Sequence, residues 1–199
     1  LEKLQAIKEK FGVPIVSDIH DPAQVEKAAQ VIDYMQIPAF LCRQTDLLVA
    51  AGETGKAINV KKGQFMAPGD MRSVIDKIYS TGNKKVSLCE RGTTFGYNNL
   101  IVDMRGLQIM ADLGCPIVFD ATHSVQLPGG QGHKSGGQPE FIPTLSRSAA
   151  AAGIQGLFME VHPEPSKALS DAANTLSLED VRANIQNVVN IRKALGYGA

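Results

Sequence analysis

Three side chains of the kind that bind divalent metal ions lie in or after two apolar runs in the second half of the sequence. His123 closes the run CPIVFDATH, Glu160 lies in GLFMEVH, and Asp171 lies on the segment that follows. One imidazole and two carboxylates form a ligand set suited to a borderline divalent cation. The spacing leaves a second interpretation open, in which His123 only hydrogen-bonds a backbone carbonyl at the end of a strand.

Cations stand at the ends of two other apolar runs. Lys61 and Lys62 occur in NVKKGQF, and Arg91 occurs in CERGTTFGY. Lysine and arginine beside glycine-rich turns can clamp a phosphate or a carboxylate, and the arginine can do so with two parallel hydrogen bonds. The alternative is that these are solvated surface charges.

Polar side chains also lie at the ends of two further apolar runs. Asp18 and His20 follow the first predicted strand, in VPIVSDI and directly after it, and Gln36 lies in YMQIPAF. Short, β-branched or apolar runs of this kind predict buried parallel strands. Six are present: VPIVSDI, YMQIPAF, KAINVKK, KKVSLCE, CPIVFDATH and GLFMEVH.

Segments with helical periodicity separate these runs, and several begin with Asp, Asn or Pro and end with Gly. They are DPAQVEKAAQVI, QTDLLVAAGETG, PGDMRSVIDKIYSTG, NLIVDMRGLQIMADLG and PEFIPTLSRSAAAAG. Strand–helix alternation predicts an α/β fold, and both an open doubly wound sheet and a closed barrel fit it. Polar residues at the ends of all six strands favour the barrel, whose ligand site collects residues from many strand ends.

We therefore expect a (β/α)8 TIM barrel with about six of its eight βα units, forming a single domain over residues 1–199 that lacks the first two strands. A complete barrel typically has about 250 residues. The chain opens with LEKLQAIKEKFG, a helix already under way and without a leading Met, so we also expect that an N-terminal portion precedes it.

The segment SVQLPGGQGHKSGGQPEF is too rich in glycine and proline to pack a core. It predicts either a disordered connector or a lid over the mouth of the barrel, and its position favours a lid that spans Gln126 to Gln138. His133 and Lys134 within it can contact a bound anion or remain solvated.

Composition excludes several classes of protein. The 199 residues are 44% hydrophobic with a net charge of +0, which predicts one globular domain and provides no basic stripe for nucleic acid or membranes. No apolar run reaches the roughly 20 residues that cross a bilayer. Three widely spaced cysteines, Cys42, Cys89 and Cys115, indicate reduced structural thiols and a cytoplasmic location.

Several of these motifs, taken together, resemble the 3-deoxy-D-manno-octulosonate 8-phosphate synthase family. The resemblance runs from Ser17 to about Leu178. It is carried by SDIHDP, QIPAFLCRQTDLL, INVKKGQF, CERGTTFGYNNLIVDMRG, FDATHSVQLPGG, SGGQPEF and MEVHPEP. It implies condensation of phosphoenolpyruvate with D-arabinose 5-phosphate and water, in the biosynthesis of the lipopolysaccharide inner core. The alternatives are a 3-deoxy-D-arabino-heptulosonate 7-phosphate synthase, which shares the barrel and the cations, and a catalytically inactive barrel fragment.

The resemblance also implies residue roles. Lys61 and Arg91 match the cations that bind phosphoenolpyruvate, and Asp18 and His20 match positions near the reacting carbons. Gln36 and Ala39 match residues that line the phosphoenolpyruvate pocket. Arg43 matches a residue that reaches the pentose phosphate of a neighbouring subunit, which implies a homo-oligomer, usually a tetramer.

His123, Glu160 and Asp171 match three metal ligands of the family. The runs Ser170-Asp171-Ala172 and Lys61-Lys62-Gly63 resemble the metal-dependent branch, because the metal-independent branch typically has Cys-Asp-Gly and Lys-Lys-Pro there. We therefore expect a divalent ion such as Zn2+, Fe2+ or Mn2+, with the remaining ligand, a Cys on the first strand, outside this chain.

Overall fold

The computed structural model describes residues 1–129 and 136–197, and the chain groups into two compact units, Leu1–Cys89 and Glu90–Ala199. The boundary falls inside a strand and not in a linker. Within the described residues, no helix is both long and apolar enough to cross a membrane.

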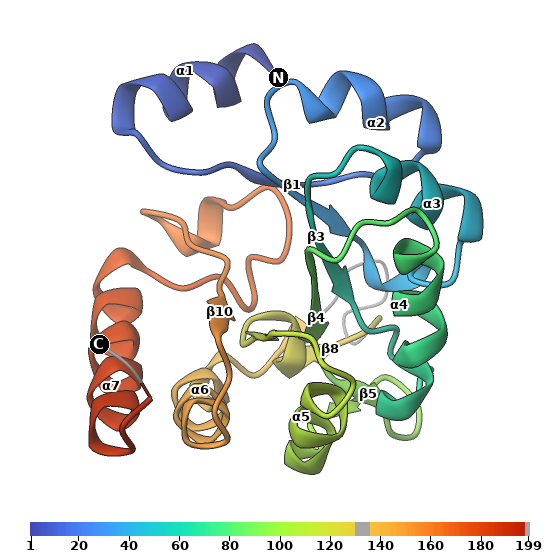
Figure 1. Cartoon of the computed structure of the whole chain (residues 1–199). Coiled ribbons are helices and arrows are strands. Elements are labelled where there is room, and N and C mark those ends of the chain that lie inside the picture. Colours follow the sequence, from blue (N-terminus) through green and yellow to red (C-terminus); the bar gives the residue numbers. More distant parts are fainter. Residues whose placement is uncertain (130–135, 198–199) are drawn as a thin grey trace. The chain divides into compact units, whose positions relative to one another are not determined.

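The first unit is a parallel sheet with helices in the connections (Figure 1). Its strands pair in sequence order and are β1 (Val16–Asp18), β2 (Tyr34–Ile37), β3 (Ala57–Lys61) and β4 (Val86–Glu90), the last of which runs into the second unit. Its helices are α1 (Glu2–Phe11), α2 (Pro22–Ala29), α3 (Thr45–Glu53) and α4 (Met71–Tyr79).

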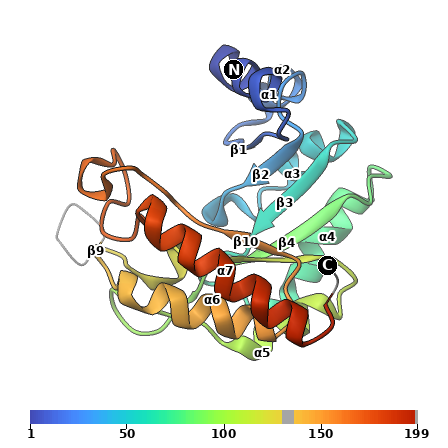
Figure 2. The same cartoon turned by 90° about the vertical axis from the view of Figure 1, so that its left-hand side faces the viewer.

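Alternation along the strands separates an apolar face from a polar face, because successive side chains of a strand point to opposite sides of the sheet. Met35, Ile58 and Leu88 are fully buried. Helices α3 and α4 lie together along one side of this sheet (Figure 2). The intervening positions carry polar residues, so the other side of the sheet is available for chemistry.

The second unit contains the parallel pair β7 (Ile117–Asp120) and β10 (Gly156–Phe158), and helices α5 (Met104–Ala111), α6 (Ile142–Ala151) and α7 (Leu178–Ala194). Helices α6 and α7 pack side by side (Figures 1 and 2). Two short antiparallel hairpins join β5 (Thr93–Thr94) to β6 (Leu100–Ile101) and β8 (Gln126–Leu127) to β9 (Gly136–Gly137).

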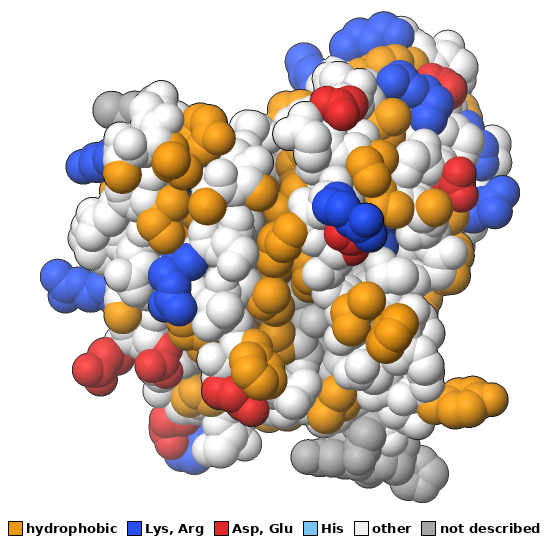
Figure 3. All heavy atoms as spheres, turned by 90° about the horizontal axis from the view of Figure 1, so that it is seen from below, with side chains coloured by type: hydrophobic (Ala, Val, Ile, Leu, Met, Phe, Trp, Pro, Cys, Tyr) orange, Lys and Arg blue, Asp and Glu red, His pale blue; other side chains and the backbone are white. Residues whose placement is uncertain are grey.

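All six predicted strands are present, and each leads into a helix, which confirms the α/β fold with six βα units of a (β/α)8 barrel. The single domain over residues 1–199 stays a prediction. Acidic and basic side chains are interspersed over the face in Figure 3, in agreement with the even charge of the sequence.

Candidate active site

The polar face of the first unit carries one continuous row of hydrogen bonds. The strand register aligns Asp18, Gln36, Asn59 and Ser87 as direct neighbours on four successive strands. Ser87 Oγ donates to Asn59 Oδ1 at 2.7 Å, Asn59 Nδ2 donates to Gln36 Oε1 at 2.9 Å, and Gln36 Nε2 donates to Asp18 Oδ1 at 2.8 Å. The hydroxyl of Tyr34 hydrogen-bonds Ser87 at the far end of the row.

This row has a direction, because every donor points toward Asp18. The Ser87 hydroxyl donates its one proton to Asn59, so it accepts a hydrogen bond from the hydroxyl of Tyr34. If the side-chain amide of Asn59 or Gln36 were flipped, its N–H groups would face another donor in the row. Gln36, Asn59 and Ser87 are almost completely buried, whereas Asp18 is exposed. The row therefore has one fixed pattern of hydrogen bonds and ends at the exposed carboxylate of Asp18, on the first strand of the sheet.

The other predicted residues of the first unit lie near the carboxyl ends of its strands. Lys61 is the last residue of β3 and is buried, and Ala39 begins a short 3-10 helix directly after β2. His20 and Arg43 are exposed, in the loops before α2 and α3. Lys62 is fully buried and its Nζ donates to the carbonyls of Gly63 and Met66, so it also stabilises its own loop.

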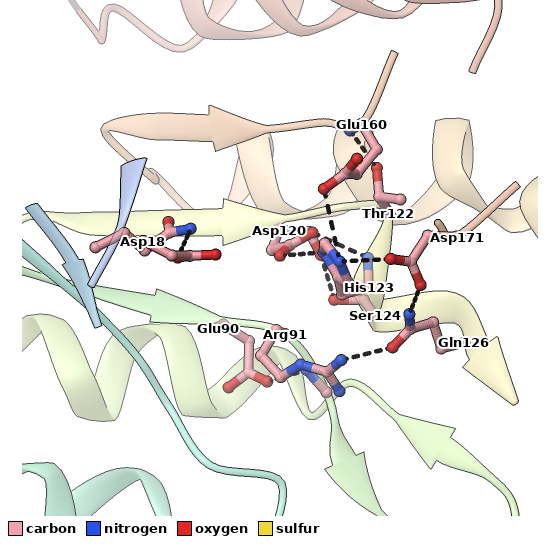
Figure 4. Close-up of polar contacts among 12 residues, drawn as sticks. Asp18, Glu90, Arg91, Asp120, Thr122, His123, Ser124, Gln126, Glu160 and Asp171 are labelled. Atoms are coloured by element: carbon pink, nitrogen blue, oxygen red, sulfur yellow. Dashed lines mark hydrogen bonds and ion pairs between the residues drawn. The ribbon is translucent and has the colours of Figure 1, made fainter. Parts of the chain in front are cut away.

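The metal-ligand candidates of the second unit converge (Figure 4). His123 Nε2 lies 3.8 Å from Glu160 Oε1 and 3.9 Å from Asp171 Oδ2. His123 follows β7, Glu160 follows β10, and Asp171 lies on the loop beyond, where its φ of 52° is one that Asp tolerates better than most residues.

Asp120 orients His123. Its Oδ1 accepts from the backbone N–H of His123 at 2.9 Å and its Oδ2 contacts the ring Nδ1 at 2.7 Å. In a neutral imidazole, a carboxylate on Nδ1 favours the tautomer that carries the proton there, with the Nε2 lone pair facing the two acidic side chains. Neutral His123 cannot donate to either of them.

A lone pair and two carboxylates that face one another form an electron-rich set that a divalent ion would neutralise. Among the described residues, no three His, Cys, Asp or Glu side chains already have the full geometry of a metal site. The side chains of His123, Glu160 and Asp171 are thus near one another, with their closest N–O distances between 3.8 Å and 3.9 Å.

Arg91 is buried directly after β4, and its Nη2 donates to Gln126 Oε1 at 2.7 Å. Gln126 Nε2 in turn donates to Asp171 Oδ1 at 2.5 Å. Glu90, also buried, accepts from the backbone N–H of Gly92 at 2.6 Å, and Gly92 has a φ of 95° that favours glycine. The hydrogen bond to Gln126 orients the guanidinium, and the Glu90 contact stabilises the turn that follows the strand.

The segment predicted to form a lid is described only at its two ends. Residues 130–135, with His133 and Lys134, lie outside the described residues. The ends pair as β8 and β9, so Gln126 stands at the base of this hairpin.

Comparison with known proteins agrees with the motifs. The sequence model of the DAHP synthetase I family matches residues 1–195. The chain belongs to this family. Members similar to it include the proteins named 2-dehydro-3-deoxyphosphooctonate aldolase from Syntrophotalea carbinolica, 59% identical over 96% of this chain and 69% of the relative, and from Geobacter sp. strain M21, 60% identical over 96% and 70%. The protein of that name from Desulfotalea psychrophila is 57% identical over 98% of this chain and 70% of its own length.

Within the DAHP synthetase I family, the names of these three relatives refer to an octonate, which is an eight-carbon acid. They do not favour the heptulosonate alternative, and they support an enzyme over an inactive barrel. The roles of the individual site residues stay predictions.

Proposed function

We propose that this chain catalyses the condensation of phosphoenolpyruvate with D-arabinose 5-phosphate and water, giving 3-deoxy-D-manno-octulosonate 8-phosphate and inorganic phosphate. The carbon count supports it, since an eight-carbon 2-dehydro-3-deoxy acid contains the three carbons of phosphoenolpyruvate and five from a phosphorylated aldose. The product would enter lipopolysaccharide inner-core biosynthesis.

The observation that carries the proposal is the pairing, in one unit, of a buried strand-end guanidinium with an imidazole flanked by two carboxylates. Arg91, together with Lys61, would neutralise the phosphate and carboxylate of phosphoenolpyruvate. Preorganised charge of this kind lets two anionic substrates approach each other. Asp18, held by the polar row, and His20 would contact the pentose near its aldehyde.

We further propose that His123, Glu160 and Asp171 hold a divalent ion such as Zn2+, Fe2+ or Mn2+. When bound, such an ion polarises the aldehyde or a water molecule. Asp120 would keep the His123 imidazole in the tautomer that can ligate.

We also propose a homo-oligomer, with a tetramer as the expected form. Phe40 is 76% exposed and Phe65 59% exposed, and Phe40 lies three residues before the exposed Arg43. Aromatic side chains and arginine are both enriched at subunit interfaces. Cys42, Cys89 and Cys115 are buried and widely spaced in the sequence, which supports the proposal of a reducing, cytoplasmic location.

The test is the identity of the product. The enzyme is incubated with phosphoenolpyruvate and either D-arabinose 5-phosphate or erythrose 4-phosphate, and the product is identified by mass spectrometry. We expect the eight-carbon acid phosphate and one equivalent of inorganic phosphate with the pentose. Turnover with the tetrose alone would assign the heptulosonate activity instead, and no turnover with either would contradict the proposal.

A further inference from the structure

The side chain of Gln126 joins Arg91 to Asp171. Gln126 opens β8, directly after the short turn that contains His123. Its Oε1 accepts from Arg91 Nη2 at 2.7 Å, and its Nε2 donates to Asp171 Oδ1 at 2.5 Å (Figure 4). Gln126 is 9% exposed, so both hydrogen bonds are largely shielded from water.

The chemistry of the two partners fixes the orientation of the amide. A guanidinium only donates and an ionised carboxylate only accepts, so a flipped amide would oppose like groups at both ends. Because Gln126 occupies Oδ1 of Asp171, the other oxygen, Oδ2, is the one that lies 3.9 Å from His123 Nε2. Gln126 thus selects the carboxylate oxygen that faces the imidazole.

We propose that Gln126 is a positioning residue that couples the anion-binding arginine to the metal-binding carboxylate. The inference rests on the proposed function, which assigns phosphoenolpyruvate to Arg91 and a divalent ion to Asp171. An anion that draws the guanidinium toward itself alters the hydrogen bond to Gln126, and Gln126 passes that change to Asp171. Substrate occupancy and metal affinity are then linked through one amide.

The test is a double-mutant cycle read by the affinity for Mn2+ alone, without substrates. The unmodified protein, Gln126→Met, Arg91→Met and the double variant are titrated with Mn2+ by calorimetry. Loss of an outer-sphere partner weakens metal binding by on the order of 10–100-fold, which is the expected effect of Gln126→Met. The effect of Arg91→Met on Mn2+ affinity should differ by about threefold or more between the unmodified background and the Gln126→Met background, since residues in one network are not additive.

Gln108→Met is the matched control. Gln108 Nε2 also donates to a carboxylate, that of Asp112, but on the exposed face of α5, so its replacement should leave the Mn2+ affinity unchanged. Should Gln126→Met not fold, Gln126→Asn keeps the amide but is one methylene too short to reach both partners, and the same loss of coupling is expected.

Equal Mn2+ affinity in the unmodified protein and Gln126→Met, or strictly additive effects in the cycle, would overturn the inference and leave the proposed function standing. If the unmodified protein binds no Mn2+, the metal proposal fails and this inference fails with it.

Discussion

Buried charge in this chain is concentrated at the ends of strands. The side chains concerned are Lys61, Lys62, Glu90, Arg91 and Asp120. Burying an ionised group is costly unless partners compensate it, so a charge placed there by the fold usually has a specific role. Arg91 is the clearest case, because it is buried and donates a hydrogen bond to the buried side chain of Gln126.

Replacing Arg91 with Ala should therefore impair catalysis far more than stability. We expect a loss of about 2–4 kcal/mol of transition-state stabilisation, because a preorganised charge at a reacting anion contributes that much. The measurement is kcat/KM for phosphoenolpyruvate. Arg105→Ala is the control, since Arg105 is exposed and pairs with Asp103 at the start of α5. An unchanged kcat/KM in Arg91→Ala would remove Arg91 from the site.

Removal of the divalent ion should abolish activity and leave the fold in place. Chelator treatment followed by an activity assay, and then by add-back of Zn2+, Fe2+ or Mn2+, measures this directly. We expect activity to return with the ion, because His123, Glu160 and Asp171 would otherwise face one another without a neutralising charge. Full activity after verified metal removal would show that the three side chains form a metal-free polar cluster.

At the scale of elements, the polar row across β1 to β4 depends on strand register. Asn59→Leu should leave Gln36 Oε1 without its donor and the hydroxyl proton of Ser87 without its acceptor. A buried group that loses its hydrogen bond costs about 1–3 kcal/mol, which denaturant unfolding can measure. Since Asn59 acts through Gln36 and Asp18, kcat should also fall. Asn190→Leu, on the outer helix α7, removes an exposed amide contact and should change neither quantity.

An ion pair attaches helix α1 to the sheet. Lys8 Nζ lies 2.6 Å from Asp33 Oδ1, and Asp33 Oδ2 accepts from the backbone N–H of Ile15 at 2.9 Å. The Lys8 ammonium, together with that N–H, lowers the pKa of Asp33 below its ordinary value.

This pKa shift predicts a pH-dependent contribution to stability. With the folded pKa below the unfolded one, the contribution is present above about pH 4 and is lost as the pH falls through the folded pKa. Asp33→Asn should therefore unfold at lower urea than the unmodified protein at pH 7, and the two should approach each other as the pH falls through the folded pKa of Asp33. Lys27→Met, on an exposed face of α2, should leave the midpoint unchanged. A difference that persists undiminished in acid would contradict the role of the ionised Asp33.

Much of the framework could be predicted from sequence, because buried parallel strands have a strong signal. All six strands form where their apolar runs occur. The prediction that a helix begins at NLIV is wrong, because Leu100 and Ile101 form β6. The helix begins after Asp103, whose side chain caps it by accepting a hydrogen bond from the backbone N–H of Arg105. Helix α7 was not predicted, because its buried residues are few and include a polar one, Asn184.

The site was only partly predictable for a related reason. His123, Glu160 and Asp171 belong to residue types that suggest metal binding on their own. Gln126 and Asp120 do not, because their roles depend on which atoms the fold places beside them. Asn59 and Ser87 became visible only through the register that aligns them with Gln36 and Asp18.

For the whole molecule, the position of the boundary between the two units predicts how the chain unfolds. Val86–Cys89 belong to the first unit and Glu90 to the second, yet all five residues form the one strand β4. Units that share a strand are expected to lose structure together, in contrast to domains joined by a flexible linker. We expect one cooperative denaturant transition, with coincident curves from far-UV circular dichroism and tyrosine fluorescence. Two separated transitions would indicate independent folding units.

The sequence-order pairing of β1 to β4 has a consequence for protein synthesis. Each strand of this sheet after β1 pairs with a strand already made, so the sheet can assemble in the order in which it leaves the ribosome. At translation rates of about 5–20 residues per second, the remaining hundred or so residues take on the order of 10 s to follow. During that interval the edge of β4 that does not face β3 would still await its partner strand, and an exposed strand edge on a nascent chain is one of the features that make chaperones necessary.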